Sequence, residues 1–440
     1  MNKIKFGFVL TIFIFVISCQ KNNEDQKETI STHAEVSHAW IDQTLKLVKD
    51  SPGFSPPVTA RTLGYLGIAM YEAGRFSNEG SLTLAGQIQG LTSTMIPQPI
   101  IGETYNWNIV VNNAASVLLH ACMDGSRPVN KTLIEEYSQN LDAVYNLNAG
   151  EKVNERSKIF GIAVGQAIAQ YAGTDNQVDC FRSNFPPSYI SPKGEGFWVP
   201  TSAQIIPLQP YWGEVRSFSA NNPNVVVAPS ITYSKNVNSD FYKQAKEVYD
   251  VSKNLTLRER TIAEFWSDDP GKSATPPGHS ISIAKISLKK QNSNFITSLE
   301  TYAKVGMGLH DAFVSCWKTK YKYNLLRPVT YIREMFDPRW NTILPTPPFP
   351  EYTSGHSVQS GAAAEILESV FGTNFAFQDD THAERTDING TPRNFVSFED
   401  FANEAASSRL YGGIHYIQAI FEGVKEGREI GKNINKLKFK

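Results

Sequence analysis

Apolar side chains recur at intervals of three and four residues along most of the chain after Val36, a spacing that places them on one face of an α-helix. The longest stripe comprises Ile296, Leu299, Tyr302, Gly306, Leu309, Phe313 and Trp317. Shorter stripes comprise Leu63, Gly67 and Met70; Val358, Ala362, Ile366 and Val370; and Phe401, Ala405, Ile414 and Ile417. The sequence contains no alternating βαβ pattern, internal repeat or glycine-rich phosphate loop. These patterns predict an all-α fold of helical bundles, with two four-helix-type bundles packed together.

The segment at about 180–240 differs from the rest, because it is rich in Pro, Asn and Ser and lacks helical periodicity. Its aromatic residues Phe197, Trp198, Tyr211 and Trp212 predict an ordered excursion that covers part of the molecule. We therefore expect an N-terminal helical region at 35–294 that contains this excursion. A helical core at 295–437 follows, and it holds the candidate site.

The N-terminus has the pattern of an export signal. Lys3 and Lys5 precede an apolar run at 6–17, which is shorter than the roughly 20 residues that span a bilayer. The run ends at Ser18-Cys19, which resembles a bacterial lipobox. We expect a signal peptide at 1–18, lipid modification of Cys19 and a flexible tether at 19–34; an ordinary cleaved signal is the alternative. The expected location is the cell envelope, periplasmic or anchored to the outer membrane, with membrane contact only through Cys19.

Composition narrows the function classes. The chain has 42 Lys+Arg against 43 Asp+Glu and a net charge of -1, which argues against a nucleic-acid partner bound through a global basic field. The 25 Phe, 18 Tyr and 7 Trp exclude disorder over most of the chain, because these side chains need burial. Three cysteines follow Cys19: Cys122, Cys180 and Cys316. An oxidising compartment permits one disulfide, with Cys122–Cys180 the least awkward pair, and the sequence leaves that pairing open.

Candidate chemistry is concentrated in three elements of the last third. The elements are Lys320 with Arg327-Pro328; Ser354-Gly355-His356 before an expected helix; and Ser408-Arg409 with His415 beyond two glycines. The three cations suit a phosphate-like oxyanion, and a Ser-Gly pair at a helix start adds a hydroxyl and free N–H groups. Two histidines at such a site divide the work, one bonding to the central atom and the other moving protons.

Each element alone has a simpler explanation. A cation after a helix is usually a solvated helix end, and Ser-Gly before a helix is usually only a cap. A histidine between Gly-Gly and an apolar run is usually a core residue. The combination in this order is much harder to explain in this way, and it predicts an oxyanion site.

The three elements resemble a known signature. Lys-x6-Arg-Pro, then Ser-Gly-His, then Ser-Arg-x5-His is shared by type-2 phosphatidic-acid phosphatases and vanadium-dependent haloperoxidases. Flanking segments such as 197–200, 210–213, 265–268, 275–279 and 345–352 resemble bacterial secreted haloperoxidases in particular. The resemblance covers roughly residues 35–435.

The resemblance implies a role for each matched residue. His415 would bind the vanadium of a vanadate cofactor, or act as the nucleophile in a phosphatase, and His356 would be the acid–base residue. The residues that would bind the vanadate oxygens are Lys320, Arg327, Arg409, Ser354 and Gly355. Trp317 would line the pocket, and Phe349 occupies a position that differs among enzymes of different halide preference. Phosphate can occupy the same site.

Two positions depart from the family pattern. Thr353 stands where Pro is commoner, and it supplies no catalytic group. Ala419 stands where the phosphatases carry an Asp that holds the nucleophilic histidine, so the residue that orients His415 is open. Of the other candidates, Asp268-Asp269 and His279 either line the entrance or form a structural turn. His310 is expected in the core or behind the site, and His120 and His382 are expected to be structural or exposed.

The resulting function prediction is a vanadate-dependent haloperoxidase that uses hydrogen peroxide to oxidise a halide to hypohalous acid. Iodide or bromide is favoured, since chloride is the hardest of the three to oxidise. The first alternative is an acid phosphatase of the same superfamily with a phospho-histidine intermediate, and the second is a non-enzymatic phosphate-binding envelope lipoprotein. The sequence does not indicate an organic substrate or an oligomeric state.

Overall fold

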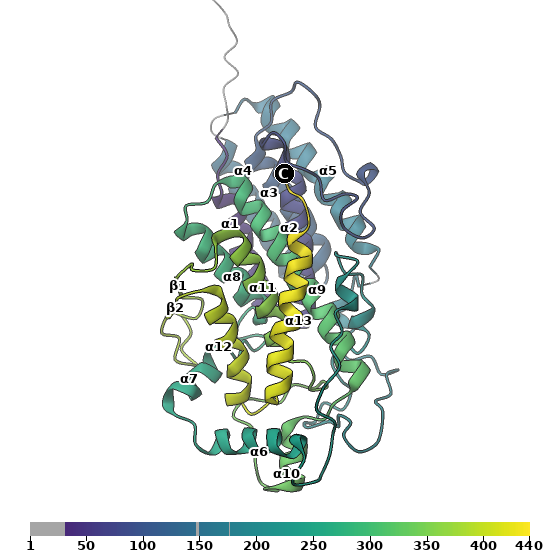
Figure 1. Cartoon of the computed structure of the whole chain (residues 1–440). Coiled ribbons are helices and arrows are strands. Elements are labelled where there is room, and N and C mark those ends of the chain that lie inside the picture. The colour runs from purple at the N-terminus through teal and green to yellow at the C-terminus, as the bar shows by residue number, and fades with distance from the viewer. Residues whose placement is uncertain (1–30, 147–148, 176) are drawn as a thin grey trace, which may run out of the picture. The chain divides into compact units, whose positions relative to one another are not determined.

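The fold is built around the longest helix, α9 (Phe295–Tyr323), in a computed structural model that describes residues 31–146, 149–175 and 177–440. All seven residues of the predicted stripe on α9 are buried. One side of α9 packs against α2 (Pro56–Gly74), and another packs against α11 (Gly355–Phe371) and α13 (Ile417–Asn435) (Figure 1). The predicted all-α fold class is confirmed.

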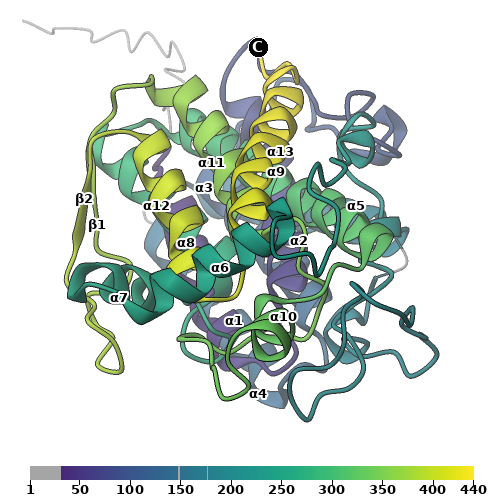
Figure 2. The ribbon, with the colours of Figure 1, turned by 60° about the horizontal axis from the view of Figure 1, so that its bottom comes forward.

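Two groups of helices therefore meet at α9. On the α2 side lie α1 (Glu35–Asp50), α3 (Trp107–Met123), α4 (Pro128–Tyr145) and α5 (Glu151–Gly173). On the α11 side lie α8 (Thr275–Lys290) and α12 (Phe398–Tyr411), with α7 (Leu257–Phe265) against α12. Helices α6 (Asp240–Lys253) and α10 (Pro328–Met335) pack on each other, as Figure 2 shows from below.

Glycines allow α2 and α9 to cross closely. A Cβ at Gly306 of α9 would lie 2.5 Å from the carbonyl oxygen of Leu63, and one at Gly67 would lie 2.6 Å from that of Tyr302. No side chain fits at such a contact, so the small residues in both stripes set the distance between the helices. This packing fixes α9, whose C-terminal end carries Lys320.

The structure adds detail to three predictions. Strands β1 (Phe377–Asp379) and β2 (Arg393–Phe395) form a short antiparallel hairpin beside α8 and α12 that the periodicity did not indicate. The stripe drawn from Phe401 to Ile417 is broken, because α12 ends at Tyr411 and α13 begins only at Ile417. Among the described residues of segment 174–239, the only helical elements are short 3-10 turns. In it Trp198 and Trp212 are buried, whereas Phe197 and Tyr211 are partly exposed.

Other predictions concern parts that the structure does not settle. The signal peptide at 1–18 and Cys19 lie outside the described residues, as does most of the tether at 19–34. Residues Thr32–Lys440 form one compact unit, and the predicted boundary at 294/295 stays a prediction. No helix among the described residues is long and apolar enough to cross a membrane.

Candidate oxyanion site

The end of α9 places Arg327. Asn324 adopts a left-handed conformation (φ 49°) and donates its N–H to the carbonyl oxygen of Lys320 at 2.8 Å, which terminates the helix. The next residues pair with the excursion: Trp198 donates to the Asn324 carbonyl at 2.6 Å, and Leu326 donates to that of Gly196 at 3.0 Å. The excursion thus holds the short segment between α9 and α10 in place.

Backbone carbonyls hold the Arg327 guanidinium. Its Nε donates to Phe349 O at 2.9 Å and its Nη1 to Ile414 O at 2.9 Å. Nη1 also lies 3.1 Å from Nε2 of His415, while Nη2 has no hydrogen-bond partner among the described residues. Burial lowers the pKa of Arg327 to about 10. The Arg327 side chain is charged at neutral pH, and its Nη2 is free to donate to a ligand.

Glu351 is the residue that orients His415, a role that Ala419 cannot fill. Its Oε1 lies 2.8 Å from Nδ1 of His415 and also accepts the N–H of Tyr416 at 2.9 Å. A carboxylate accepts, so Nδ1 carries the proton and Nε2 keeps its lone pair. Burial, together with Arg327 and Lys320, lowers the pKa of His415 well below its usual value. His415 is therefore neutral, with Nε2 as the atom that can bind a metal.

The ammonium group of Lys320 binds the loop before α11. It donates to three backbone carbonyls, those of Pro350, Glu351 and Thr353. An ammonium has three protons, so each is engaged with the loop that precedes α11. Burial lowers the pKa of Lys320 to about 8. In this conformation Lys320 contributes positive potential and fixes the loop, and it has no spare donor for an oxyanion.

The start of α11 supplies the second histidine. Ser354 is the N-cap of α11, and its hydroxyl accepts the N–H of Ser357 at 3.4 Å. His356 lies in the first turn, where its Nε2 is buried and has no partner among the described residues. Burial and the charge of Arg409 lower the pKa of His356 well below its usual value. His356 is thus a neutral imidazole with a free nitrogen.

Arg409, at the end of α12, completes the site. It donates to the carbonyl oxygen of Trp266 at 2.7 Å and to the Ser408 hydroxyl at 3.0 Å, and burial lowers its pKa to about 10. A cavity of about 410 Å³ opens onto the site. Residues that line it include Trp317, Phe349, Gly355, His356, Arg409 and His415.

The three cations lack acidic partners. Among the ion pairs of the described residues, none involves Lys320, Arg327 or Arg409, although all three are buried. Two buried carboxyl groups lie nearby, and burial raises the pKa of both Glu351 and Glu426 to about 7. Because both carboxyl groups are only partly ionised near neutral pH, they do not fully balance the three cations. The remaining positive charge and the free Arg327 Nη2 fit a small oxyanion.

Of the remaining sequence candidates, the two aspartates line the cavity and the histidines do not. Asp268 and Asp269 line the cavity, but His279 does not; it is buried against Asp268. His310 is buried behind the excursion, with Nε2 3.0 Å from the carbonyl oxygen of Arg216. His120 is half-buried beside Glu135.

The structure decides two points that the sequence left open. His382 is 2% exposed and bonds to Asp268, so of the two alternatives for this residue the structural one holds. Cys122, Cys180 and Cys316 are all free thiols in the structure, so the Cys122–Cys180 pairing that the sequence left open is not formed. Glu351 was not recognised as a site residue, because only the fold brings it to His415.

Solved structures share this fold. A bacterial vanadium-dependent iodoperoxidase matches with a TM-score of 0.83 and 38% identity, over 93% of this chain and 98% of that chain. The holo and apo forms of a bacterial vanadium-dependent chloroperoxidase match with TM-scores of 0.65 and 0.63 at 16% identity, which shows a common fold. They cover 92% and 89% of this chain, respectively, and 98% of each matched chain. No curated protein matches the sequence.

The fold and the site together define the class of this protein: it is a helical protein with a buried, positively charged site for an oxyanion. The model of the VCPO second helical-bundle domain matches residues 300–439, which include every residue of the three-part signature. Together with the 38% identity to the iodoperoxidase over almost its full length, this match identifies the family. The chain belongs to the vanadium-dependent haloperoxidases.

Proposed function

We propose that this chain is a vanadate-dependent haloperoxidase that oxidises iodide or bromide with hydrogen peroxide to hypohalous acid. The observation that carries the proposal is the environment of His415. Its Nδ1–H is directed to Glu351, and the lone pair of its Nε2 faces Nη1 of Arg327 at 3.1 Å, a guanidinium that has no carboxylate partner. A neutral imidazole among uncompensated cations suits a metal oxyanion.

The residues present fit vanadate. His415 Nε2 would bind the vanadium, while Arg327 Nη2, Arg409 and the N-terminus of α11 at Ser354 and Gly355 would bind the oxygens. When bound, vanadate supplies Lewis-acid activation of peroxide towards attack by halide. Lys320 holds the loop before α11 and raises the local potential, which favours the anion.

Proton transfer is the task of His356. His356 lines the cavity, its Nε2 has no hydrogen-bond partner among the described residues, and its lowered pKa keeps it unprotonated at neutral pH. It would therefore accept a proton from hydrogen peroxide that enters the site. Trp317 and Phe349 form an apolar wall of the cavity, with ring centroids 5.0 Å apart, that excludes bulk water from the site.

The test is a pair of assays on the purified chain. After loading with orthovanadate, iodide oxidation by peroxide is expected, whereas phosphate-monoester hydrolysis is expected to be absent. The iodoperoxidase that is 38% identical makes iodide the first halide to assay. Hydrolysis inhibited by vanadate, without halide oxidation, would contradict the proposal and favour the phosphatase. Tight phosphate binding with neither activity would favour the non-enzymatic alternative. Neither alternative is favoured by the family match.

We also propose that the chain is exported and anchored by lipid at Cys19. Lys3 and Lys5, the apolar run at 6–17 and the lipobox-like Ser18-Cys19 support this proposal. Metabolic labelling with a palmitate analogue in the native host tests it: wild-type chain is expected to incorporate the label, and Cys19→Ser is expected to lose it. Equal labelling of both would contradict lipidation of Cys19.

A further inference from the structure

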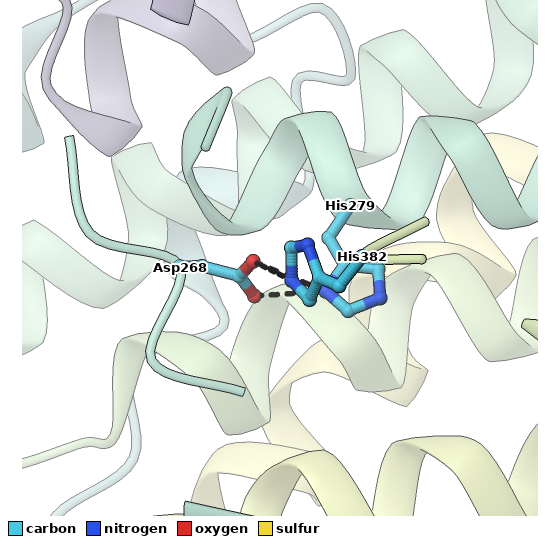
Figure 3. Close-up of side chains that lie close together, drawn as sticks. All are labelled: Asp268, His279 and His382. Atoms are coloured by element: carbon cyan, nitrogen blue, oxygen red, sulfur yellow. Dashed lines mark hydrogen bonds and ion pairs between the residues drawn. The ribbon is translucent and has the colours of Figure 1, made fainter. Parts of the chain in front are cut away.

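A second cluster of ligand-type side chains lies beyond one wall of the cavity. It comprises Asp268, in the loop after α7; His279, in α8; and His382, in the loop after β1. Figure 3 shows the Asp268 carboxylate facing both imidazole rings. Asp268 lies 2.9 Å from Nδ1 of His279 and 2.9 Å from Nε2 of His382. All three residues are at most 2% exposed.

The distances match those between the ligands of one metal ion. One ligand atom from each residue lies within 4.8 Å of the other two. Zinc binds His nitrogen and carboxylate oxygen at about 2.0–2.2 Å, which separates adjacent ligand atoms by roughly 3–3.5 Å. The observed contacts of 2.9 to 3.2 Å between Asp268 and the rings need only a small outward movement to admit an ion.

A fourth residue orients the first histidine. Nε2 of His279, on the far side of the ring from Asp268, lies 2.7 Å from Oδ2 of Asp379. Asp379 is itself held by the N–H of Thr381 at 3.0 Å, and Trp266 stacks on the imidazole at 4.4 Å. A carboxylate behind a histidine is the usual support of a metal ligand, because it holds the proton on one nitrogen. Without an ion, Nδ1 of His279 donates its own proton to Asp268, and a metal ion would take the place of that proton.

An ion has a route to these residues. A cavity of about 830 Å³, separate from the one at the oxyanion site, is lined by Asp268, His279 and His382. Further acidic residues on its wall include Asp380 and Asp387. Water in this cavity can complete the coordination of an ion that takes three ligands from the protein.

We propose that Asp268, His279 Nδ1 and His382 Nε2 bind a divalent transition-metal ion, with Asp379 orienting His279. Two imidazoles and a carboxylate suit Zn²⁺ best among the abundant ions, whereas Ca²⁺ and Mg²⁺ prefer oxygen ligands alone. The ion joins three separate segments: the loop after α7, α8 and the loop after β1. Because Asp268 also lines the oxyanion cavity, the ion would fix one wall of that cavity.

Metal content of the purified full chain gives the first test. The protein is stripped with a chelator, dialysed against Zn²⁺ and analysed by mass spectrometry for zinc and vanadium. We expect one zinc ion per chain, bound whether or not vanadate is present. Co²⁺ in place of Zn²⁺ is expected to give the visible absorption of a site with nitrogen ligands. These readouts do not depend on haloperoxidase activity, so they remain informative if the proposed function fails.

Variants then locate the ion. Asp379→Asn is expected to weaken zinc binding about 10- to 100-fold. His382→Gln, which keeps a donor for Asp268 but removes a ligand, is expected to weaken it further. The control is His120→Gln in α3, which removes another histidine and is expected to bind zinc like wild type. If wild-type protein binds no zinc or cobalt, or if folded His382→Gln binds both unchanged, the proposal is overturned. The cluster is then an ion-pair network with His279 as an imidazolium between two carboxylates.

Discussion

Two buried arginine environments differ in what balances the charge. Arg61, in α2, binds Asp175 through two hydrogen bonds of 2.7 and 2.9 Å, and Tyr65 donates to the same carboxylate at 2.9 Å. Burial acts to lower the pKa of Arg61, but the bond to Asp175 outweighs it and raises the pKa above the usual value. Arg327 is equally buried, yet backbone carbonyls and a neutral histidine are its partners, and its pKa is lowered.

The difference separates a structural ion pair from a binding site. At Arg61 the chain supplies its own anion, so the charge is neutralised within the folded protein. Two further buried cations, Lys320 and Arg409, belong to the same site as Arg327. A bound anion would neutralise this charge. The following predictions test that division, from the largest expected effect to the smallest.

His415→Ala should abolish vanadate binding and reduce halide oxidation to background, because it removes the nitrogen that would bind vanadium. Vanadium content after gel filtration and iodide oxidation measure the two effects. His120→Gln serves as the control and should retain both. Turnover at the wild-type rate in His415→Ala would show that the site has been assigned to the wrong residues.

Arg61→Ala should mainly reduce the stability of the fold, whereas Arg327→Ala should mainly weaken vanadate binding. Arg61→Ala leaves Asp175 buried and unpaired, so the free energy of unfolding should fall by about 3–5 kcal/mol. Arg327→Ala should cost less stability but weaken vanadate binding roughly 10- to 150-fold, since a charged hydrogen bond contributes about 1.5–3 kcal/mol. Urea denaturation and vanadate titration measure these quantities. Similar losses of stability in both variants would remove the distinction.

The free energy of unfolding should depend on pH through the buried carboxyl groups. Burial raises the pKa of Glu426 from 4.5 to about 7. Between these values the folded state binds more protons than the unfolded state, so stability falls as the pH rises from 4.5 to 7. Between pH 4.5 and 7 the free energy of unfolding of Glu426→Gln should fall less than that of wild type, and the difference should be on the order of 3 kcal/mol. Parallel pH profiles for wild type and Glu426→Gln would contradict the raised pKa.

Glu351→Ala should weaken vanadate binding about 10- to 100-fold, because His415 loses the acceptor that fixes its tautomer. The matched control is Glu426→Gln, another buried glutamate near Lys320, which bonds to Ser315 and Thr353 instead of a histidine. A vanadate titration at neutral pH compares the two. An equal effect in both variants would mean that general electrostatics, and not orientation of His415, is responsible.

Phe349→Leu should have the smallest effect, a roughly two- to fivefold change in the KM for halide. The ring centroid lies 5.1 Å from Lys320 Nζ and 4.9 Å from the Arg327 guanidinium carbon, so the substitution removes cation–π contacts of about 0.5–1 kcal/mol. Steady-state kinetics with iodide and bromide measure the change. A loss of more than a hundredfold in kcat would show that Phe349 positions the catalytic groups.

Sequence reasoning predicted the helices and signature residues, but not the contacts that orient them. Periodicity found the buried face of α9, and the signature predicted that Arg327, His356, Arg409 and His415 would meet. It did not indicate that Glu351 bonds to His415, because 64 residues separate them and nothing in local spacing marks the contact.

The wall of the oxyanion cavity comes from two kinds of structure. The residues that would hold the anion are at helix ends and in the turn before α13, which the packing of α9, α11 and α12 fixes. The outer wall comes instead from loops at 53–55, 184–185, 208 and 344–349. Exposed positions in those loops, such as Phe185, can change without altering the helix packing. Substrate range can therefore diverge among relatives while the chemistry stays the same, and the loops are the part to randomise in directed evolution.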